Sequence, residues 1–360
     1  MSNEKTKIVT NEVDINNNMA IVNQRYEWVD VLKALGIIAI YLGHCVDHTG
    51  KLHLFLYTYH VPLFFFVAGF FCISKREMSF KNYIKNKVSS ILIPYLWFSI
   101  AYILMIGIAK SKGDILSIFL MIKQTIFGIR NQLPADSLWF LPCLFVISIM
   151  YEALYRIFKD RRRVLLCSVI LFIITQTIFP QNPLTSPAYF FNIDSAMYYI
   201  IYYALGSEIF TYIKKFSYKS LNRSGKSVFV GSIILFSIIA VTVFLVGRDS
   251  ILEFMGMPNL INSILIVIVA LIMIYLNIIL SWILRKNSYL QVLGKSTLIL
   301  CGTEQLLKAV IRGSFLLIGL NVDGAPNFIG ITYAMICFLL SYDIVIPMVS
   351  KLLQKRNAKQ

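Results

Sequence analysis

The chain has 360 residues, of which 58% are hydrophobic, and its mean hydropathy is +0.70. This composition excludes an ordinary soluble protein, because too much apolar sequence would have to face water. The formal net charge of +16 does not indicate nucleic-acid binding, since the basic residues recur in short clusters between apolar runs instead of forming one patch.

Apolar runs close to the roughly 20 residues that cross a bilayer recur along the whole chain. We therefore expect an all-α, polytopic membrane bundle of about ten transmembrane helices. The predicted spans cover residues 28–47, 52–73, 88–109, 138–158, 163–180, 194–213, 227–247, 260–284, 296–317 and 328–350. We expect a polar tail over 1–27, one transmembrane domain over 28–350 and a basic tail over 351–360.

The basic residues predict the orientation of the bundle. If the N-terminus is cytoplasmic and the spans alternate, the inside segments hold 25 of the 34 basic residues and the outside segments hold six. This asymmetry agrees with the positive-inside rule, so both termini are expected in the cytoplasm. Residues 78–90 are basic and amphipathic, which suits a helix lying on an anionic leaflet, and residues 110–137 contain a candidate interfacial helix.

Ionisable residues concentrate in the first two spans. The chain has four histidines, and all of them lie in this stretch: His44, His48, His53 and His60. Lys33 and His44 are eleven positions apart, so a helix places them on one face, about 16 Å apart along its axis. Asp30 lies one turn before Lys33, and His48 lies one turn after His44. Charges and imidazoles inside a span are costly and usually mark a functional site.

Each of these residues also has a purely structural interpretation. His44 suits a general base, because imidazole titrates near neutral pH, but a histidine in a span also serves as a hydrogen bond between helices. Lys33 either meets an anionic group that arrives from the cytoplasm or only neutralises Asp30. Next to His60, Pro62 is expected to interrupt the helix, and Gly69 permits close approach of another helix. A run of phenylalanines alone would simply face lipid.

Two later spans carry further candidates. Trp139 begins the fourth span, where it fits either an anchor at the membrane interface or a platform for a sugar ring. Glu304, Lys308 and Arg312 are spaced by four in the ninth span, so they share one face and pair with one another or belong to a polar interior. The sequence contains no Gly-rich phosphate loop, metal-ligand spacing or C-x-x-C pair, so we expect no metal site and no disulfide framework.

A family resemblance rests on the first two spans. Arg25, Asp30, Lys33 and His44 form the pattern R-x4-D-x2-K-x10-H, and YHVPLFFFVAGFF follows it. Together with ILIPYLWF at 91–98, DSLWFLPCLF at 136–145 and LGKSTLIL at 293–300, this pattern resembles the membrane-bound acyltransferase-3 family. The likeness is greatest to the branch of fucose 4-O-acetylase and related acetyltransferases.

The resemblance implies a membrane O-acyltransferase that uses cytosolic acetyl-CoA to acylate a carbohydrate on the far side of the membrane. The family's basic-x10-His pair maps onto Lys33 and His44, and its Phe-His-x-Pro-Leu-Phe-Phe element maps onto the stretch from His60 to Phe65. Arginine is the common first member of the pair, so Lys33 is a variation. This chain also has Glu304 near the point where the family often has a histidine.

We therefore expect an O-acetyltransferase of the bacterial plasma membrane that acts on an extracytoplasmic or lipid-linked carbohydrate of the cell surface. The expected catalytic residues are His44 as the general base, Asp30, Lys33 and His60. The expected substrate-binding residues are Trp139, Glu304, Lys308, Arg312 and Arg25. Membrane lipid surrounds the bundle, and the oligomeric state stays open, a homodimer included. The alternative is a non-catalytic exporter or flippase of a lipid-linked sugar, because a polar seam through a bundle also suits transport.

Overall fold

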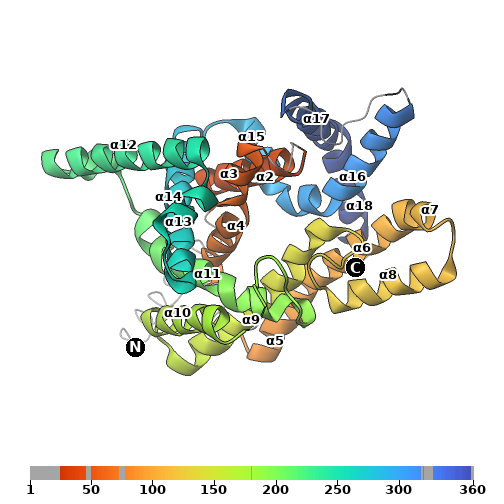
Figure 1. Ribbon diagram of the computed structural model, residues 1–360, viewed down its shortest axis with the longest axis horizontal. Coiled ribbons are helices and arrows are strands. Elements are labelled where there is room, and N and C mark those ends of the chain that lie inside the picture. The colour runs from red at the N-terminus through yellow and green to blue at the C-terminus, as the bar shows by residue number, and fades with distance from the viewer. Residues whose placement is uncertain are drawn as a thin grey trace, which may run out of the picture.

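A computed structural model describes residues 25–45, 50–72, 78–179, 181–317, 319 and 327–357, and over these residues the chain is all-helical (Figure 1). The α-helices in chain order are α2 Glu27–Cys45, α3 Lys51–Tyr57, α4 His60–Gly69, α5 Phe80–Lys87, α6 Ile93–Tyr102, α7 Ile108–Lys110, α8 Ile115–Phe127, α9 Phe140–Phe158, α10 Arg161–Thr177, α11 Ile193–Ile213, α12 Arg223–Val246, α13 Arg248–Met255, α14 Asn259–Ile283, α15 Ser288–Lys295, α16 Thr297–Leu317, α17 Asn327–Leu340 and α18 Ile346–Asn357. The 3₁₀ turn η4, Asp136–Trp139, leads into α9.

Helices occupy all ten predicted spans. In the described part of the chain, seven helical rods are long and apolar enough to cross a membrane: Glu27–Cys45, Lys51–Gly69, Phe80–Lys110, Asp136–Phe158, Arg223–Val246, Asn259–Ile283 and Phe328–Lys351. The other three predicted spans are α10, which has 17 residues, and α11 and α16, which are rich in tyrosine or in charged residues. The protein is a polytopic helical membrane bundle, as its composition predicts.

Helix α2 lies inside the bundle, with α4, α14, α15, α16 and α17 packed around it. At its N-terminal end, the ring of Trp28 lies 5.9 Å from Phe70, 6.4 Å from Phe210 and 6.0 Å from Trp282. These three rings come from the C-terminal ends of α4, α11 and α14. If successive spans alternate in direction, these four helix ends belong to the same side of the membrane. The structure brings them together, in agreement with that alternation.

Helices α4 and α11 cross through their glycines. A Cβ atom at Gly69 would overlap the backbone carbonyl of Tyr203, and one at Gly206 would overlap the backbone carbonyl of Phe66. The predicted close approach at Gly69 is confirmed. Helix α11 is largely buried, whereas α12 has a single buried residue, Val243, and extends away from the rest of the bundle (Figure 1).

The second predicted span is interrupted just before His60, as the proline there predicts. Pro62 has no N–H, and its ring excludes the carbonyl four residues earlier, that of Thr58. The backbone N–H groups of Thr58 and Tyr59 donate to Phe55 and Leu56 instead, three residues back. The span is therefore two helices, α3 and α4, and His60 begins the second of them.

Residues 78–90 do not form the separate surface helix that their charge pattern predicts. Helix α5 continues through a π-helical turn, Val88–Leu92, directly into α6 as one rod. Tyr83 of α5 is buried, and its hydroxyl donates to the Ser148 carbonyl of α9 at 3.4 Å. No glycine or proline occurs between Phe80 and Pro94, and the π-helical turn absorbs the missing N–H of that proline, so the helix does not break.

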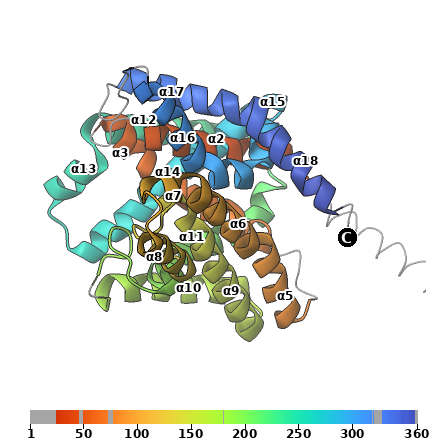
Figure 2. The same ribbon diagram turned by 90° about the vertical axis from the view of Figure 1, so that its right-hand side faces the viewer.

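The helix expected within residues 110–137 is present as α8. It is N-capped by Asp114, whose carboxylate accepts the Ser117 N–H at 2.8 Å, and it ends at Gly128 with φ of 65°. The last span differs from its expected boundary. Helix α18 continues to Asn357, past the predicted end of the last span, and Figure 2 shows it running on from α17 along the edge of the bundle.

Candidate active site

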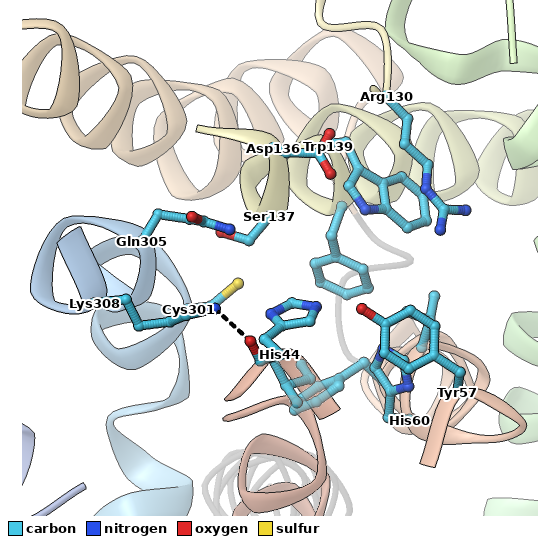
Figure 3. Close-up of a pocket in the computed structure, with 14 residues that line it drawn as sticks. His44, Tyr57, His60, Arg130, Asp136, Ser137, Trp139, Cys301, Gln305 and Lys308 are labelled. Atoms are coloured by element: carbon cyan, nitrogen blue, oxygen red, sulfur yellow. Dashed lines mark hydrogen bonds between the residues drawn. The ribbon is translucent and has the colours of Figure 1, made fainter. Parts of the chain in front are cut away.

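A cavity of about 310 Å³ lies where the C-terminal end of α2, the start of α4, η4 and α16 meet. Its lining includes His44 from α2, His60 from α4, Trp139 from η4, and Gln305 and Lys308 from α16 (Figure 3). Four helical segments from different parts of the sequence thus bring polar and ionisable side chains to one cavity.

His44 is the best-oriented base in this cavity. Its Nδ1 lies 2.8 Å from Oε1 of Glu304, and its side chain is 19% exposed. A carboxylate can only accept a hydrogen bond, so Nδ1 carries a proton, and in the neutral imidazole Nε2 then has the free lone pair. In Figure 3 the His44 ring lies in the cavity between α2 and η4. This arrangement presents a proton acceptor to any molecule that enters.

Glu304 is a fully buried carboxylate that is paired twice. Its Oε1 contacts His44 and also lies 3.3 Å from Nζ of Lys308, one turn further along α16. Lys308 Nζ in turn donates to the backbone carbonyl of His44 at 2.8 Å. The Tyr333 hydroxyl donates to the Lys308 carbonyl at 2.7 Å, which joins α17 to the same cluster. A buried carboxylate requires such partners, because an unpaired charge in a bundle is very costly.

His60 lies beside His44 but is held differently. It is buried, and its Nδ1 lies 2.8 Å from the Leu56 carbonyl, in the turn that Pro62 opens. Its ring centroid is 6.2 Å from that of His44 and 4.6 Å from that of Tyr57. Since no carboxylate of the described residues contacts it, His60 supports the shape of the cavity next to His44 rather than forming a second charged pair.

The opposite wall consists of η4 and the loop after α8. Trp139 is buried, and the guanidinium of Arg130 lies 4.5 Å from the centre of its ring. Asn192 holds this wall in place, because its side-chain amide accepts from the Arg130 N–H at 2.7 Å and donates to the Gly128 carbonyl at 2.7 Å. An interfacial anchor would face lipid, so that interpretation of Trp139 does not fit. One face of the indole is also covered by arginine, which leaves less of it for a sugar ring.

A second polar cluster lies at the other end of α2. The buried carboxylate of Asp30 is 2.7 Å from Nε of Arg25 and 2.9 Å from Nζ of Lys33. Lys33 also borders a second cavity of about 260 Å³, whose other walls are almost entirely apolar. The two cavities adjoin, because they share four lining residues: Ile40, Phe64, Phe140 and Cys301. Lys33 and His44 therefore border two neighbouring spaces along one side of α2.

The remaining predicted residues lie outside both cavities. Arg25 is 58% exposed at its side chain and contacts Asp30. Arg312 is exposed on α16 and is absent from both cavity linings, although Glu304 and Lys308 on the same helix belong to the cluster. His53 Nδ1 lies 2.7 Å from the Gly43 carbonyl, and its ring stacks on Tyr57. His48 lies outside the described residues.

Several lining residues were not predicted from the sequence. They are Tyr57, Arg130, Asp136, Ser137, Cys301 and Gln305. Two signals were available: Asp136 and Ser137 belong to the DSLWFLP stretch, and Gln305 follows Glu304 directly. Arg130 gave no local signal, because it looks like one more basic residue of an outside loop. Only the pairing of that loop with Asn192 brings Arg130 to the cavity.

The comparison with known families agrees with the first two spans. A family model of the acyltransferase-3 type, described as "Acyltransferase domain", matches residues 26–346. This match covers every residue of the cluster around His44 as well as Asp30 and Lys33. No curated protein and no solved structure matches the chain.

Proposed function

The chain belongs to the acyltransferase-3 family of membrane acyltransferases, and on that premise we propose that it transfers an acetyl group from cytosolic acetyl-CoA to a hydroxyl of a carbohydrate outside the cell. The observation that carries this proposal is the His44–Glu304 pair, which presents Nε2 of a partly buried imidazole to the cavity. In this proposal the acceptor is a cell-surface polysaccharide or its lipid-linked precursor, the membrane is the bacterial plasma membrane, and the branch is that of the fucose 4-O-acetylases.

The transfer needs one base and one route for the leaving group. His44 Nε2 takes the proton from the acceptor hydroxyl, whose oxygen attacks the carbonyl carbon of the thioester. The C–S bond breaks, and the coenzyme A sulfur leaves with the proton that His44 then carries. Glu304 stabilises the imidazolium during this step, because its carboxylate lies 2.8 Å from Nδ1. The same residue keeps the imidazole in the tautomer that the reaction needs.

The donor is proposed to arrive through the second cavity. Lys33 borders that cavity at one end, and the shared wall of Phe64, Phe140 and Cys301 leads to His44 at the other. Eleven residues of helix correspond to about 16 Å, a distance that an extended pantetheine arm covers. The expected topology puts the basic inside segments on the same side of the membrane as Lys33. Positive charge on that side suits the phosphates of coenzyme A.

The other predicted site residues take supporting roles in this mechanism. His60 is proposed to hold the acceptor hydroxyl or a water molecule beside His44, and Asp30 to position Lys33. Lys308 keeps Glu304 charged and anchors the end of α2 through the His44 carbonyl. Trp139 shapes the acceptor side of the cavity. Arg25 acts only through Asp30, and Arg312 has no role in this mechanism.

A reconstituted assay separates this function from export without chemistry. Purified protein in lipid nanodiscs is supplied with acetyl-CoA labelled in the acetyl group and with surface glycans extracted from the host. We expect release of coenzyme A thiol together with labelled glycan in equal amounts, and loss of both in His44→Ala. In proteoliposomes, movement of glycan across the membrane without any thiol release would support the exporter and end the proposed mechanism.

A further inference from the structure

The cavity wall opposite His44 contains a cation that pairs with no carboxylate in the part of the chain that the structure describes. Arg130 follows α8, lines the cavity and is half-buried. None of the ion pairs among the described residues includes it. Lys308, which lines the same cavity, is paired with Glu304 at 3.3 Å. A guanidinium inside a helical bundle is costly unless an anion offsets its charge, so the missing anion is expected to come from the ligand.

The guanidinium of Arg130 is held in one orientation. Its Nη1 donates to the Leu184 carbonyl at 2.6 Å, and its plane lies over Trp139 at 4.5 Å. Arginine carries five N–H donors in a rigid fork, so donors remain for a ligand after these contacts. A fixed fork recognises a planar or tetrahedral oxyanion with little further loss of freedom.

A second unsatisfied group lies on the same wall. Ser137 is 8% exposed and lines the cavity, and its hydroxyl has no hydrogen-bond partner among the described residues. Buried hydroxyls are normally bonded, so this one is expected to bond a ligand or water in the cavity. Asp136 lines the cavity too, but it is exposed, and its carboxylate accepts the Asn131 N–H at 2.8 Å. The buried part of the wall therefore offers donors.

Resting on the proposed acetyltransferase function, we propose that Arg130 and Ser137 bind an oxyanion carried by the acceptor, so that the acceptor is an acidic sugar. The group is either the carboxylate of a uronic acid or the phosphate ester of a sugar phosphate. It binds on the η4 wall while another hydroxyl of the same sugar faces His44. Arg130 is in this way a specificity determinant of the acceptor and takes no part in proton transfer.

The test measures binding and turnover with three probes: methyl glucuronide, glucose 1-phosphate and the neutral methyl glucoside. Isothermal titration on protein in nanodiscs gives Kd, and thiol release from acetyl-CoA gives kcat and KM. For Arg130→Gln we expect Kd and KM of the preferred anionic probe to rise about 10- to 100-fold, the range for hydrogen bonds to charged groups. The values for methyl glucoside should stay unchanged. Which anionic probe binds more tightly distinguishes the carboxylate from the phosphate.

The control is Lys123→Gln, which removes a cation from an exposed position of α8 that lines neither cavity. It should change none of the values. Equal effects of Arg130→Gln on all three probes, or wild-type protein that binds methyl glucoside as tightly as both anions, would overturn the proposal. If Arg130→Gln abolishes anion binding in protein that consumes no acetyl-CoA, the anion site stands and the proposed function fails. If the protein releases thiol from acetyl-CoA and Arg130→Gln changes neither Kd nor KM of the anionic probes, the proposed function stands and the anion site fails.

Discussion

The two ends of α2 carry similar charged residues in very different surroundings. At the N-terminal end, Asp30 is paired with Arg25 and Lys33, and Arg25 is 58% exposed. At the C-terminal end, Glu304 is fully buried, and its partner His44 keeps one ring nitrogen for the cavity. The first cluster satisfies its own charges, and the second leaves a base free. A cluster of charges in a membrane span is therefore a candidate for catalysis only where one of its groups keeps a donor or acceptor atom that faces a cavity.

The first way to test this comparison is to remove the free base. His44→Ala should lower the transfer rate about 1,000-fold, within the range that general-base catalysis contributes. The protein should still fold, because the histidine is partly exposed to the cavity and its removal leaves Glu304 paired with Lys308. Thiol release and a melting curve in detergent measure the two effects. Retention of more than a tenth of the rate would show that His44 is not the base.

The second test separates the position of the base from the stability of the bundle. Glu304→Gln should lower kcat about 10- to 100-fold, because Nδ1 loses its anionic partner, and should also destabilise the fold by about 3–5 kcal/mol, because Lys308 becomes a buried charge without a partner. The double variant Glu304→Gln/Lys308→Met should recover the melting temperature but not kcat. Recovery of kcat as well would mean that Glu304 serves packing alone.

The third test compares how closely helices approach α2 at its two ends. A Cβ atom at Gly294 of α15 would overlap the backbone of Asp30, whereas one at Gly43 would meet side chains, Tyr57 at 3.1 Å and Leu56 at 3.7 Å. Gly294→Ala should therefore destabilise the protein by about 1–3 kcal/mol, since a backbone cannot yield. Gly43→Ala should change the melting temperature little and alter acceptor KM through the Tyr57 ring. The opposite ranking of the two melting temperatures would contradict the packing described above.

The smallest effects on activity are expected at the N-terminal end of α2, where Asp30 is paired with both Arg25 and Lys33. Lys33→Ala should raise KM for acetyl-CoA about tenfold with little change in kcat, because Lys33 is proposed to attract the donor and does not touch the reacting atoms. Arg25→Ala should change either constant by less than about fivefold, as expected for an exposed ion pair worth up to about 1 kcal/mol. A large fall in kcat for Lys33→Ala would move the chemistry toward this end of α2.

Local sequence patterns predicted much of the fold. The interruption before His60 and the close approach at Gly69 follow from the covalent properties of proline and glycine, and both are confirmed. The prediction for residues 78–90 failed because charge periodicity does not reveal whether a helix ends. Helices α11 and α16 show that a local pattern also does not reveal where in the bundle a helix lies. They are among the more polar of the predicted spans, yet α11 is largely buried, and α16 buries the carboxylate of Glu304 against His44 and Lys308.

The sequence by itself determined that this is a membrane bundle, where its spans lie, and that Lys33 and His44 share one face of the first of them. Those properties depend on composition and on the geometry of a single helix. Only the tertiary structure decided that Glu304 pairs with His44 across 260 positions, that Arg130 faces the same cavity and that two cavities adjoin along α2. A polar face shows that a helix needs a polar neighbour, but which neighbour it meets depends on how all the helices pack.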